Sequence, residues 1–298
     1  MFPSTFGIAD GLRLHCHLTG PMRGTASVSV ILVHTLGDHS QSLPYRELTR
    51  QLSNQGMAVY AYDLRGHGRS PGARVFIERW SDYRDDLQAF IEEVERTAPQ
   101  TPIHLLGLGL GGLIVLDYAQ NRPAGLRGVV AIAPWLEDAG MAGWRRWLLG
   151  RLAPFLPRLQ LDAGLDYTGI ARDQVAVRRY TSDPTYQRKT TPRLTLEISK
   201  AIAQTQRMAA HSRLSMLLLQ GSEDPIAPAT GSALFHANVG SWDKELRLYE
   251  GATHNLLIEN DRAHVIEDIA NWIARRTQTP RLLIGDPRLQ SASTVTSS

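Results

Sequence analysis

The sequence has a single cysteine, Cys16, among its 298 residues, so an intrachain disulfide is excluded. A chain without disulfides fits a reducing compartment. No stretch reaches the roughly 18 apolar residues of a membrane span, and residues 1–10 lack the basic start and apolar run of a secretory signal. We therefore expect a cytoplasmic protein in which Cys16 is a buried structural thiol.

A large excess of charge of one sign is also missing. The 32 basic and 29 acidic residues leave a net charge of +3, which is too small for the basic surface that binds nucleic acid. No group of His, Cys, Asp and Glu has the spacing of metal ligands. We expect no nucleic-acid partner, no metal and no other cofactor. The content of 43% hydrophobic and 20% charged residues is typical of a globular protein.

Short apolar runs alternate with helical patterns along the chain. The runs that predict strands are residues 12–18, 27–33, 57–62, 103–106, 126–132, 214–220 and 245–249. Apolar residues spaced by three and four positions predict a helix from Trp80 to Val94, and a final helix is expected at about residues 262–275. This alternation predicts an α/β fold with a mostly parallel, doubly wound sheet, in which ligands bind beyond the carboxyl ends of the strands.

One long segment, between the strands expected at residues 126–132 and 214–220, interrupts this alternation, and we expect it to form a helical cap over the sheet. The end of the chain, which finishes in SASTVTSS, has too little apolar content to pack. The expected parts are two halves of a core, the cap between them and a flexible tail: residues 1–133, 212–276, 134–211 and 277–298.

The cap contains several aromatic residues, and Trp144 and Trp147 are its candidate substrate contacts. The same residues could equally bury the cap against the core. Arginines alternate with apolar residues over residues 144–156, a pattern that suits a helix resting on a lipid surface as well as a helix docked on its own core. Peripheral membrane contact through the cap therefore stays an alternative, and the sequence does not indicate the oligomeric state.

A glycine-rich turn follows the strand that ends at Leu106. Residues 107–112 read GLGLGG and lead into a helical run at residues 113–119. A nucleophile elbow, G-x-S-x-G, has the same strand–turn–helix context, but its central position here is Gly109, which has no side chain that could attack a substrate. The glycines also fit the dinucleotide pattern G-x-G-x-x-G, which belongs to a first βα turn with an acidic residue about 20 positions on. Neither condition is met.

Two polar residues follow later strands. Asp224 lies in the turn GSEDP, and His254 lies in the turn GATHN. An isolated Asp in a turn or His in a loop is usually structural. In hydrolases of this fold, however, the nucleophile, acid and base follow one another along the chain, and positions 109, 224 and 254 keep that order. The order and the loop context together predict that Asp224 and His254 are the acid and the base.

Two further motifs are residues 33–40 (VHTLGDHS) and 62–70 (YDLRGHGRS). With the motifs around positions 224 and 254, they resemble the monoacylglycerol lipase and lysophospholipase-like branch of the α/β-hydrolases over residues 12–276. The resemblance implies hydrolysis of carboxylic esters with apolar acyl chains, so the expected partner is an apolar ester or lipid-like small molecule. It also implies that His254, oriented by Asp224, deprotonates a nucleophile at position 109 and that the backbone N–H groups of Leu36 and Leu110 form the oxyanion hole.

The chain departs from the family pattern at two positions, with Thr35 in place of glycine and Gly109 in place of serine. A β-branched residue is costly at positive φ, so Thr35 could reshape the substrate-binding loop. Loss of the nucleophile costs on the order of a millionfold in rate. Three functions remain open: an ester hydrolase disabled in this form, a lipid- or small-molecule-binding pseudoenzyme, and a serine-independent enzyme in which His254 and Asp224 activate water.

Overall fold

The computed structural model describes residues 2–21, 26–138 and 141–278. Its strands are β1 (Thr5–Gly7), β2 (Arg13–Thr19), β3 (Val28–Val33), β4 (Met57–Tyr62), β5 (Ile103–Leu108), β6 (Leu126–Ile132), β7 (Leu161–Asp162), β8 (Lys189–Thr190), β9 (Ser215–Gly221) and β10 (Lys244–Tyr249). Its helices are α1 (Leu43–Asn54), α2 (Ser81–Thr97), α3 (Leu110–Asn121), α4 (Gly143–Leu152), α5 (Gln174–Thr181), α6 (Pro192–Arg207), α7 (Ala229–Asn238) and α8 (Arg262–Gln278), with short 3-10 helices η1 (Tyr167–Ile170) and η2 (Ala209–His211).

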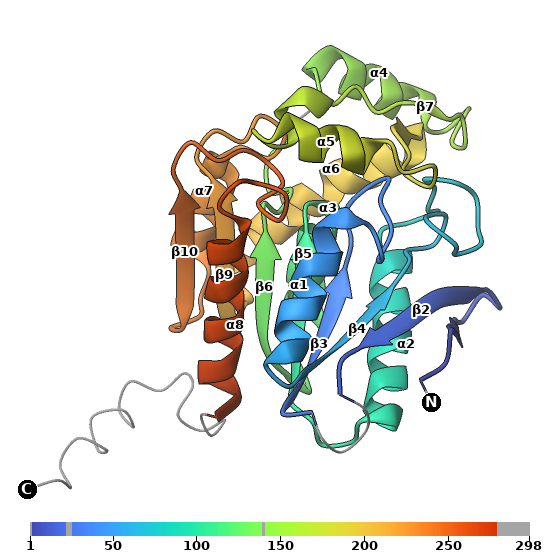
Figure 1. The fold of residues 1–298 in the computed structure, drawn as a ribbon. Coiled ribbons are helices and arrows are strands. Elements are labelled where there is room, and N and C mark those ends of the chain that lie inside the picture. The colour runs from blue at the N-terminus through green and yellow to red at the C-terminus, as the bar shows by residue number, and fades with distance from the viewer. Residues whose placement is uncertain (1, 22–25, 139–140, 279–298) are drawn as a thin grey trace, which may run out of the picture.

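Eight of these strands form one twisted sheet in the order β1-β2-β4-β3-β5-β6-β9-β10 (Figure 1). β2 pairs antiparallel with both β1 and β4, whereas the strands from β4 to β10 are parallel neighbours. The prediction of a mostly parallel α/β sheet is confirmed.

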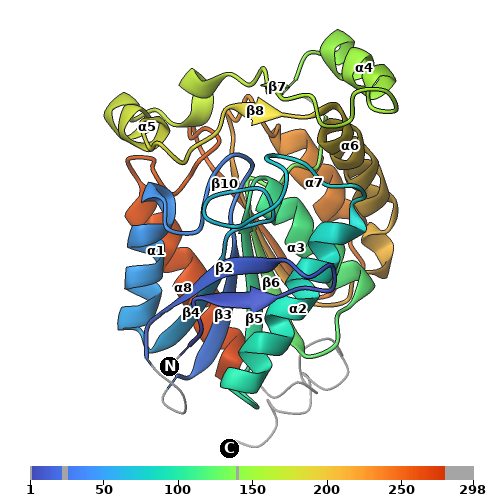
Figure 2. The same ribbon diagram turned by 90° about the vertical axis from the view of Figure 1, so that its right-hand side faces the viewer.

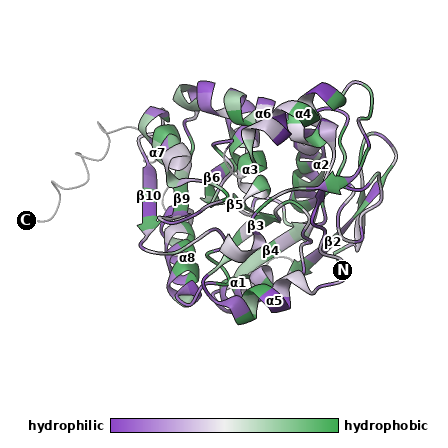
Figure 3. Cartoon of the chain, turned by 90° about the horizontal axis from the view of Figure 1, so that it is seen from above, coloured by the Kyte–Doolittle hydropathy of each residue, from purple (hydrophilic) through white to green (hydrophobic). Residues whose placement is uncertain are grey.

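Helices cover both faces of the sheet, which explains why the central strands are apolar along their whole length. Every residue of β3, β4 and β5 is buried. α1 and α8 pack on one face through residues such as Leu48 and Ile269, and α2 and α3 pack on the other through Leu87 and Leu113 (Figure 2). Viewed from above, β10 at the edge of the sheet is mostly hydrophilic, in contrast to the inner strands (Figure 3).

The segment between β6 and β9 lies above the carboxyl ends of the strands (Figures 1 and 2). It contains α4, α5 and α6, together with η1, η2 and a small sheet of β7 and β8. α6 contributes Leu194 and Ile198 to the main core. This segment corresponds to the predicted cap, which is therefore not purely helical.

The last helix is longer than predicted. α8 continues to Gln278, two residues into the predicted tail, and residues 279–298 lie outside the described residues. Within the described part of the chain, no helix combines the length and the apolar character needed to cross a bilayer. Cys16 is buried, and burial raises the pKa of its thiol to about 12.

His104 in β5 gives stability a measurable dependence on pH. It packs edge-on against Trp272 of α8, with ring centroids 5.8 Å apart, and burial lowers the pKa of His104 to about 3. Between about pH 6.5, the pKa of an unfolded histidine, and pH 3 the unfolded chain therefore binds a proton that the native state does not, so stability falls as the pH falls.

We expect His104→Leu to reduce the slope of the free energy of unfolding against pH by about 1.4 kcal/mol per pH unit. Urea unfolding measured from pH 7.5 down to pH 4 checks it. The exposed His264, changed to Leu, is the matched control and should leave the slope nearly unchanged. An unaltered slope in His104→Leu would contradict the assignment.

Candidate active site

β5 passes into α3 through a sharp turn at Gly109. Its φ of +56° and ψ of −115° lie in a region that L side chains rarely adopt. A Cβ atom on Gly107 would overlap the main chain of Gly111, and one on Gly111 would overlap the carbonyl group of Val33, so both neighbours must be glycine. The turn therefore has the strand–turn–helix form of a nucleophile elbow.

Asp224 and His254 form a buried pair at the ends of β9 and β10. His254 Nδ1 lies 2.8 Å from Asp224 Oδ2, which also accepts a hydrogen bond of 2.9 Å from the Gln220 amide. Asp224 Oδ1 accepts hydrogen bonds from the backbone N–H groups of Ile226 and Ala227, each at 2.8 Å. These donors fix the direction of the carboxylate. Asp224 thereby orients the imidazole so that Nδ1 donates and Nε2 is left as an acceptor.

The structure brings this pair to the turn at Gly109. A Cβ atom built on Gly109 would lie 3.4 Å from His254 Nε2. Parallel strands end at the same edge of a sheet, and β5, β9 and β10 deliver residues 109, 224 and 254 to that edge from segments far apart in the sequence. All three predicted positions are therefore neighbours in space.

The Thr35 side chain fills the space above Gly109. Its hydroxyl would overlap a Cβ atom placed on Gly109, and its own Cβ would lie 3.2 Å from that atom. The backbone N–H of Leu110 donates to Thr35 Oγ1 at 3.3 Å. Among the described residues, the backbone N–H of Leu36 has no hydrogen-bond acceptor. Of the two N–H groups predicted for the oxyanion hole, that of Leu110 thus lies beside the Thr35 hydroxyl, and that of Leu36 belongs to the next residue along the chain.

The backbone of Thr35 is not strained, contrary to the expectation from its β-branched side chain. The non-glycine residues with positive φ in the described chain are Val75, Gln100 and Ala133. Thr35 alters the site through the volume and the hydroxyl of its side chain, since its φ is not positive.

Hydrogen bonds on several sides hold the loop that carries Thr35. Burial lowers the pKa of His34 and keeps its ring neutral, so Nε2 accepts the Leu64 N–H at 2.9 Å and Nδ1 donates to the Thr35 carbonyl at 2.7 Å. The Thr35 N–H donates to the Tyr45 hydroxyl at 3.1 Å. The cap helix α5 joins the loop through Tyr180, whose hydroxyl donates to Asp38 at 2.7 Å. Thr35 is therefore held in place.

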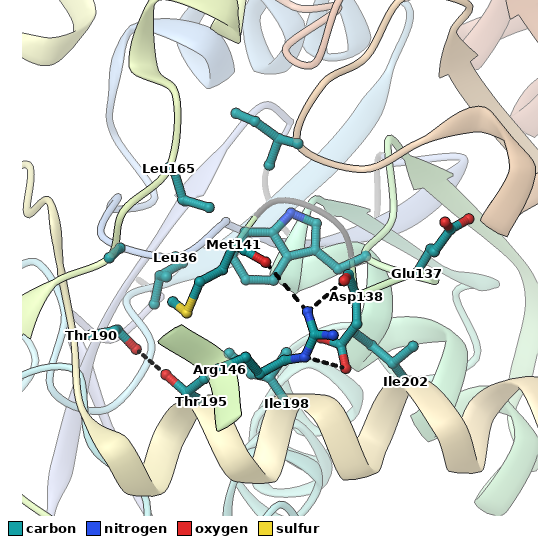
Figure 4. Close-up of a pocket in the computed structure, with 13 residues that line it drawn as sticks. Leu36, Glu137, Asp138, Met141, Arg146, Leu165, Thr190, Thr195, Ile198 and Ile202 are labelled. Carbon is teal, nitrogen blue, oxygen red and sulfur yellow. Dashed lines mark hydrogen bonds and ion pairs between the residues drawn. The ribbon is translucent and has the colours of Figure 1, made fainter. Parts of the chain in front are cut away.

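A narrow apolar cavity of about 50 Å³ lies between the cap and the core (Figure 4). α6 supplies Ile198 and Ile202 to its wall, and an ion pair of Arg146 with Asp138 at 3.6 Å adds a polar edge. An adjoining cavity of about 20 Å³ is lined by Thr35 and His254. Four residues line both cavities: Leu36, Trp135, Leu165 and Ile226.

Comparison with known proteins identifies the family. Residues 24–261 match the Hydrolase_4 family, described as serine aminopeptidase, S33. The chain belongs to this family. Monoglyceride lipase of Homo sapiens is 31% identical, with 91% of this chain and 90% of that protein aligned. Monoacylglycerol lipase of Mycolicibacterium smegmatis is 28% identical, with 90% and 95% aligned.

Solved structures agree with this assignment to the Hydrolase_4 family. Monoacylglycerol lipase of Paleococcus ferrophilus superposes with a TM-score of 0.81 at 30% identity, covering 88% of this chain and 99% of that one. A soluble variant of monoglyceride lipase from Saccharomyces cerevisiae, in complex with a substrate analogue, gives a TM-score of 0.83 at 25% identity, covering 93% and 96%. The chain thus has an α/β-hydrolase fold, and its relatives are lipases.

Trp144 and Trp147, the predicted substrate contacts, lie away from both of these cavities. Both are on α4, 68% and 64% exposed, and neither lines the two cavities described above. The cavity wall instead comes from α6, which the sequence analysis did not single out. Its buried stripe, which includes Leu194, Ile198 and Ile202 at helical spacing, is the signal that could have found it.

Proposed function

We propose that this member of the Hydrolase_4 family is a carboxylic-ester hydrolase for esters of long apolar acyl chains, of which a monoacylglycerol is the model substrate. The observation that carries the proposal is the apolar cavity beside the Asp224–His254 pair. An acyl chain would fill the cavity and place its ester group near His254 Nε2. The names of the relatives, monoglyceride and monoacylglycerol lipases, support this substrate class.

Each polar group of the site has a role in this proposal. His254 acts as general base, and Asp224 orients it and stabilises the imidazolium that forms. The backbone N–H groups of Leu36 and Leu110 stabilise the negative charge on the carbonyl oxygen. Gly109 occupies the nucleophile position without a hydroxyl, so another oxygen must attack the carbonyl carbon while His254 takes its proton.

Filling the cavity should alter chain-length preference. Ile198 lines the cavity on α6, and an indole at this position would take up space that a long acyl chain needs. We expect Ile198→Trp to raise KM for p-nitrophenyl palmitate about 10-fold and to leave p-nitrophenyl acetate nearly unaffected. The measurement is kcat and KM for a series of esters of increasing acyl-chain length, with the unaltered protein and Ile198→Trp both purified and a mock preparation as the blank.

Leu234→Trp, at an exposed position of α7, is the matched control for added indole bulk. Equal changes for short and long esters in Ile198→Trp would place the acyl chain elsewhere.

A second candidate function, lipid binding without catalysis, is favoured by the Thr35 hydroxyl that fills the space above Gly109. Lipid retained by the purified protein, with no hydrolysis of any ester, would decide for it.

The exposed apolar side chains around α4 support a contact with lipid surfaces. Besides Trp144 and Trp147, Phe155 is 81% exposed, and Arg151 lies over the Trp147 ring at 5.3 Å. Apolar and cationic side chains together suit an interface with anionic lipid. We expect the double change Trp144→Ser and Trp147→Ser to lower the fraction sedimenting with phosphatidylglycerol vesicles about 10-fold. An unchanged fraction would exclude this surface.

A further inference from the structure

The Thr35 hydroxyl lies where a serine side chain at position 109 would project. A Cβ atom on Gly109 would overlap that hydroxyl and would stand 3.4 Å from His254 Nε2. Thr35 Oγ1 and His254 Nε2 therefore face the same small space from two sides. Thr35 and His254 also line the same cavity, and the hydroxyl-bearing residue is only 8% exposed.

We propose that Thr35 is the nucleophile of this hydrolase and that its hydroxyl replaces the one absent at position 109. The inference rests on the proposed ester hydrolysis and names the oxygen that the reaction needs. Both altered positions of the chain, Thr35 and Gly109, then have one explanation. Removal of the side chain at position 109 makes the room in which the threonine hydroxyl sits.

The two backbone donors keep their roles in this arrangement. In a nucleophile elbow the residue after the nucleophile donates one N–H to the oxyanion, and a second loop donates the other. With Thr35 as nucleophile, Leu36 becomes the residue that follows it, and Leu110 supplies the second N–H. Leu36 N–H has no acceptor among the described residues, and Leu110 N–H already lies 3.3 Å from Thr35 Oγ1. Leu110 N–H therefore lies beside the reacting oxygen, and Leu36 N–H is left to bind the oxyanion.

The loop around Thr35 restricts the motion of this hydroxyl. The carbonyl of Thr35 accepts from the His34 ring at 2.7 Å and from the Asp38 N–H at 3.3 Å, and its N–H donates to Tyr45. Fixed backbone contacts on both sides limit the side chain to rotation about χ1, which has few wells in a β-branched residue. Thr35 Oγ1 makes no hydrogen bond to His254 Nε2 in the described structure, so rotation about χ1 is the motion that would bring the hydroxyl to its base.

The covalent step balances without any co-reactant other than water. Thr35 Oγ1 forms a bond to the ester carbonyl carbon while its proton passes to His254 Nε2. The bond to the alcohol oxygen then breaks, and the alcohol leaves with that proton. Water, deprotonated by His254, attacks the acyl-threonine, and the carboxylic acid leaves as the proton returns to Oγ1.

A fluorophosphonate probe tests the assignment, since a nucleophilic oxygen displaces its fluoride and keeps the phosphonyl group. We expect one adduct per chain, located on Thr35 by peptide mass spectrometry. Thr35→Val, which keeps the shape and removes the hydroxyl, should lose the adduct and lower kcat/KM for p-nitrophenyl butyrate on the order of 10³-fold. Thr35→Ser should keep the adduct and lie within about 10-fold of the unaltered chain.

The remaining outcomes overturn the proposal and separate its failure from that of ester hydrolysis. If Thr35→Val hydrolyses esters as fast as the unaltered chain, water is the nucleophile and ester hydrolysis stands. If neither chain hydrolyses any ester and no adduct forms at Thr35, both the nucleophile and the proposed function are wrong. Circular dichroism and thermal unfolding of Thr35→Val confirm that a loss of rate is not a loss of fold.

Discussion

Gly109→Ser combined with Thr35→Gly is expected to raise kcat/KM for short p-nitrophenyl esters by about 10²- to 10³-fold, whereas Gly109→Ser alone should give little gain. The reason is steric. A Cβ atom on Gly109 would overlap the Thr35 hydroxyl, so a serine introduced alone must displace a side chain whose loop is held by Tyr45 and His34. Glycine at position 35 clears that space and leaves the N–H groups of Leu36 and Leu110 for the oxyanion.

The double-mutant cycle supplies its own controls. Thr35→Gly alone removes the hydroxyl that faces the same space as His254 and should have the lowest rate of the four chains. The coupling between the two positions is the measured quantity, because residues that touch are not additive. If Gly109→Ser alone were as active as the pair, Thr35 would move aside readily, and the steric explanation would fail.

The sheet could be predicted closely because its strands are buried on both faces. The apolar runs at residues 57–62 and 126–132, the second interrupted only by Arg127, coincide with β4 and β6. α1 was not among the predicted elements, although its Leu48 and Leu52 are buried one turn apart. α5 was also missed, since only Val177 and Tyr180 of its residues are buried and the apolar period is faint.

The site was predictable in its order along the chain and not in its side-chain packing. Positions 109, 224 and 254 follow parallel strands, so topology alone brings them together. The sequence analysis expected Thr35 to change the backbone of its loop. In the structure its side chain changes the site instead, because its hydroxyl occupies the space that a side chain at position 109 would fill. Trp144 was assigned to substrate because an apolar helix pattern does not tell which neighbour its apolar side chains face.

Loss of His254 should abolish most of the hydrolysis. We expect His254→Ala to lower kcat/KM for p-nitrophenyl butyrate by about 10²- to 10⁴-fold, because the imidazole that takes the proton of the attacking oxygen is then missing. Asp224→Asn should lower kcat/KM by a similar factor. The amide nitrogen of asparagine is a donor, and it would face either the Nδ1 proton of His254 or the N–H groups of Ile226 and Ala227, which donate to the carboxylate.

His264→Ala is the matched control for removal of an imidazole, because that ring is 68% exposed on α8 and should leave the rate unchanged. The prediction holds whether water or Thr35 attacks, since either oxygen must lose a proton to His254. The fluorophosphonate probe separates the two mechanisms. If Thr35 is the nucleophile, His254→Ala slows both labelling of Thr35 and ester hydrolysis. If water attacks, the unaltered chain hydrolyses esters and Thr35 is not labelled. Full activity in His254→Ala would place the reaction outside the space between Thr35 and Gly109.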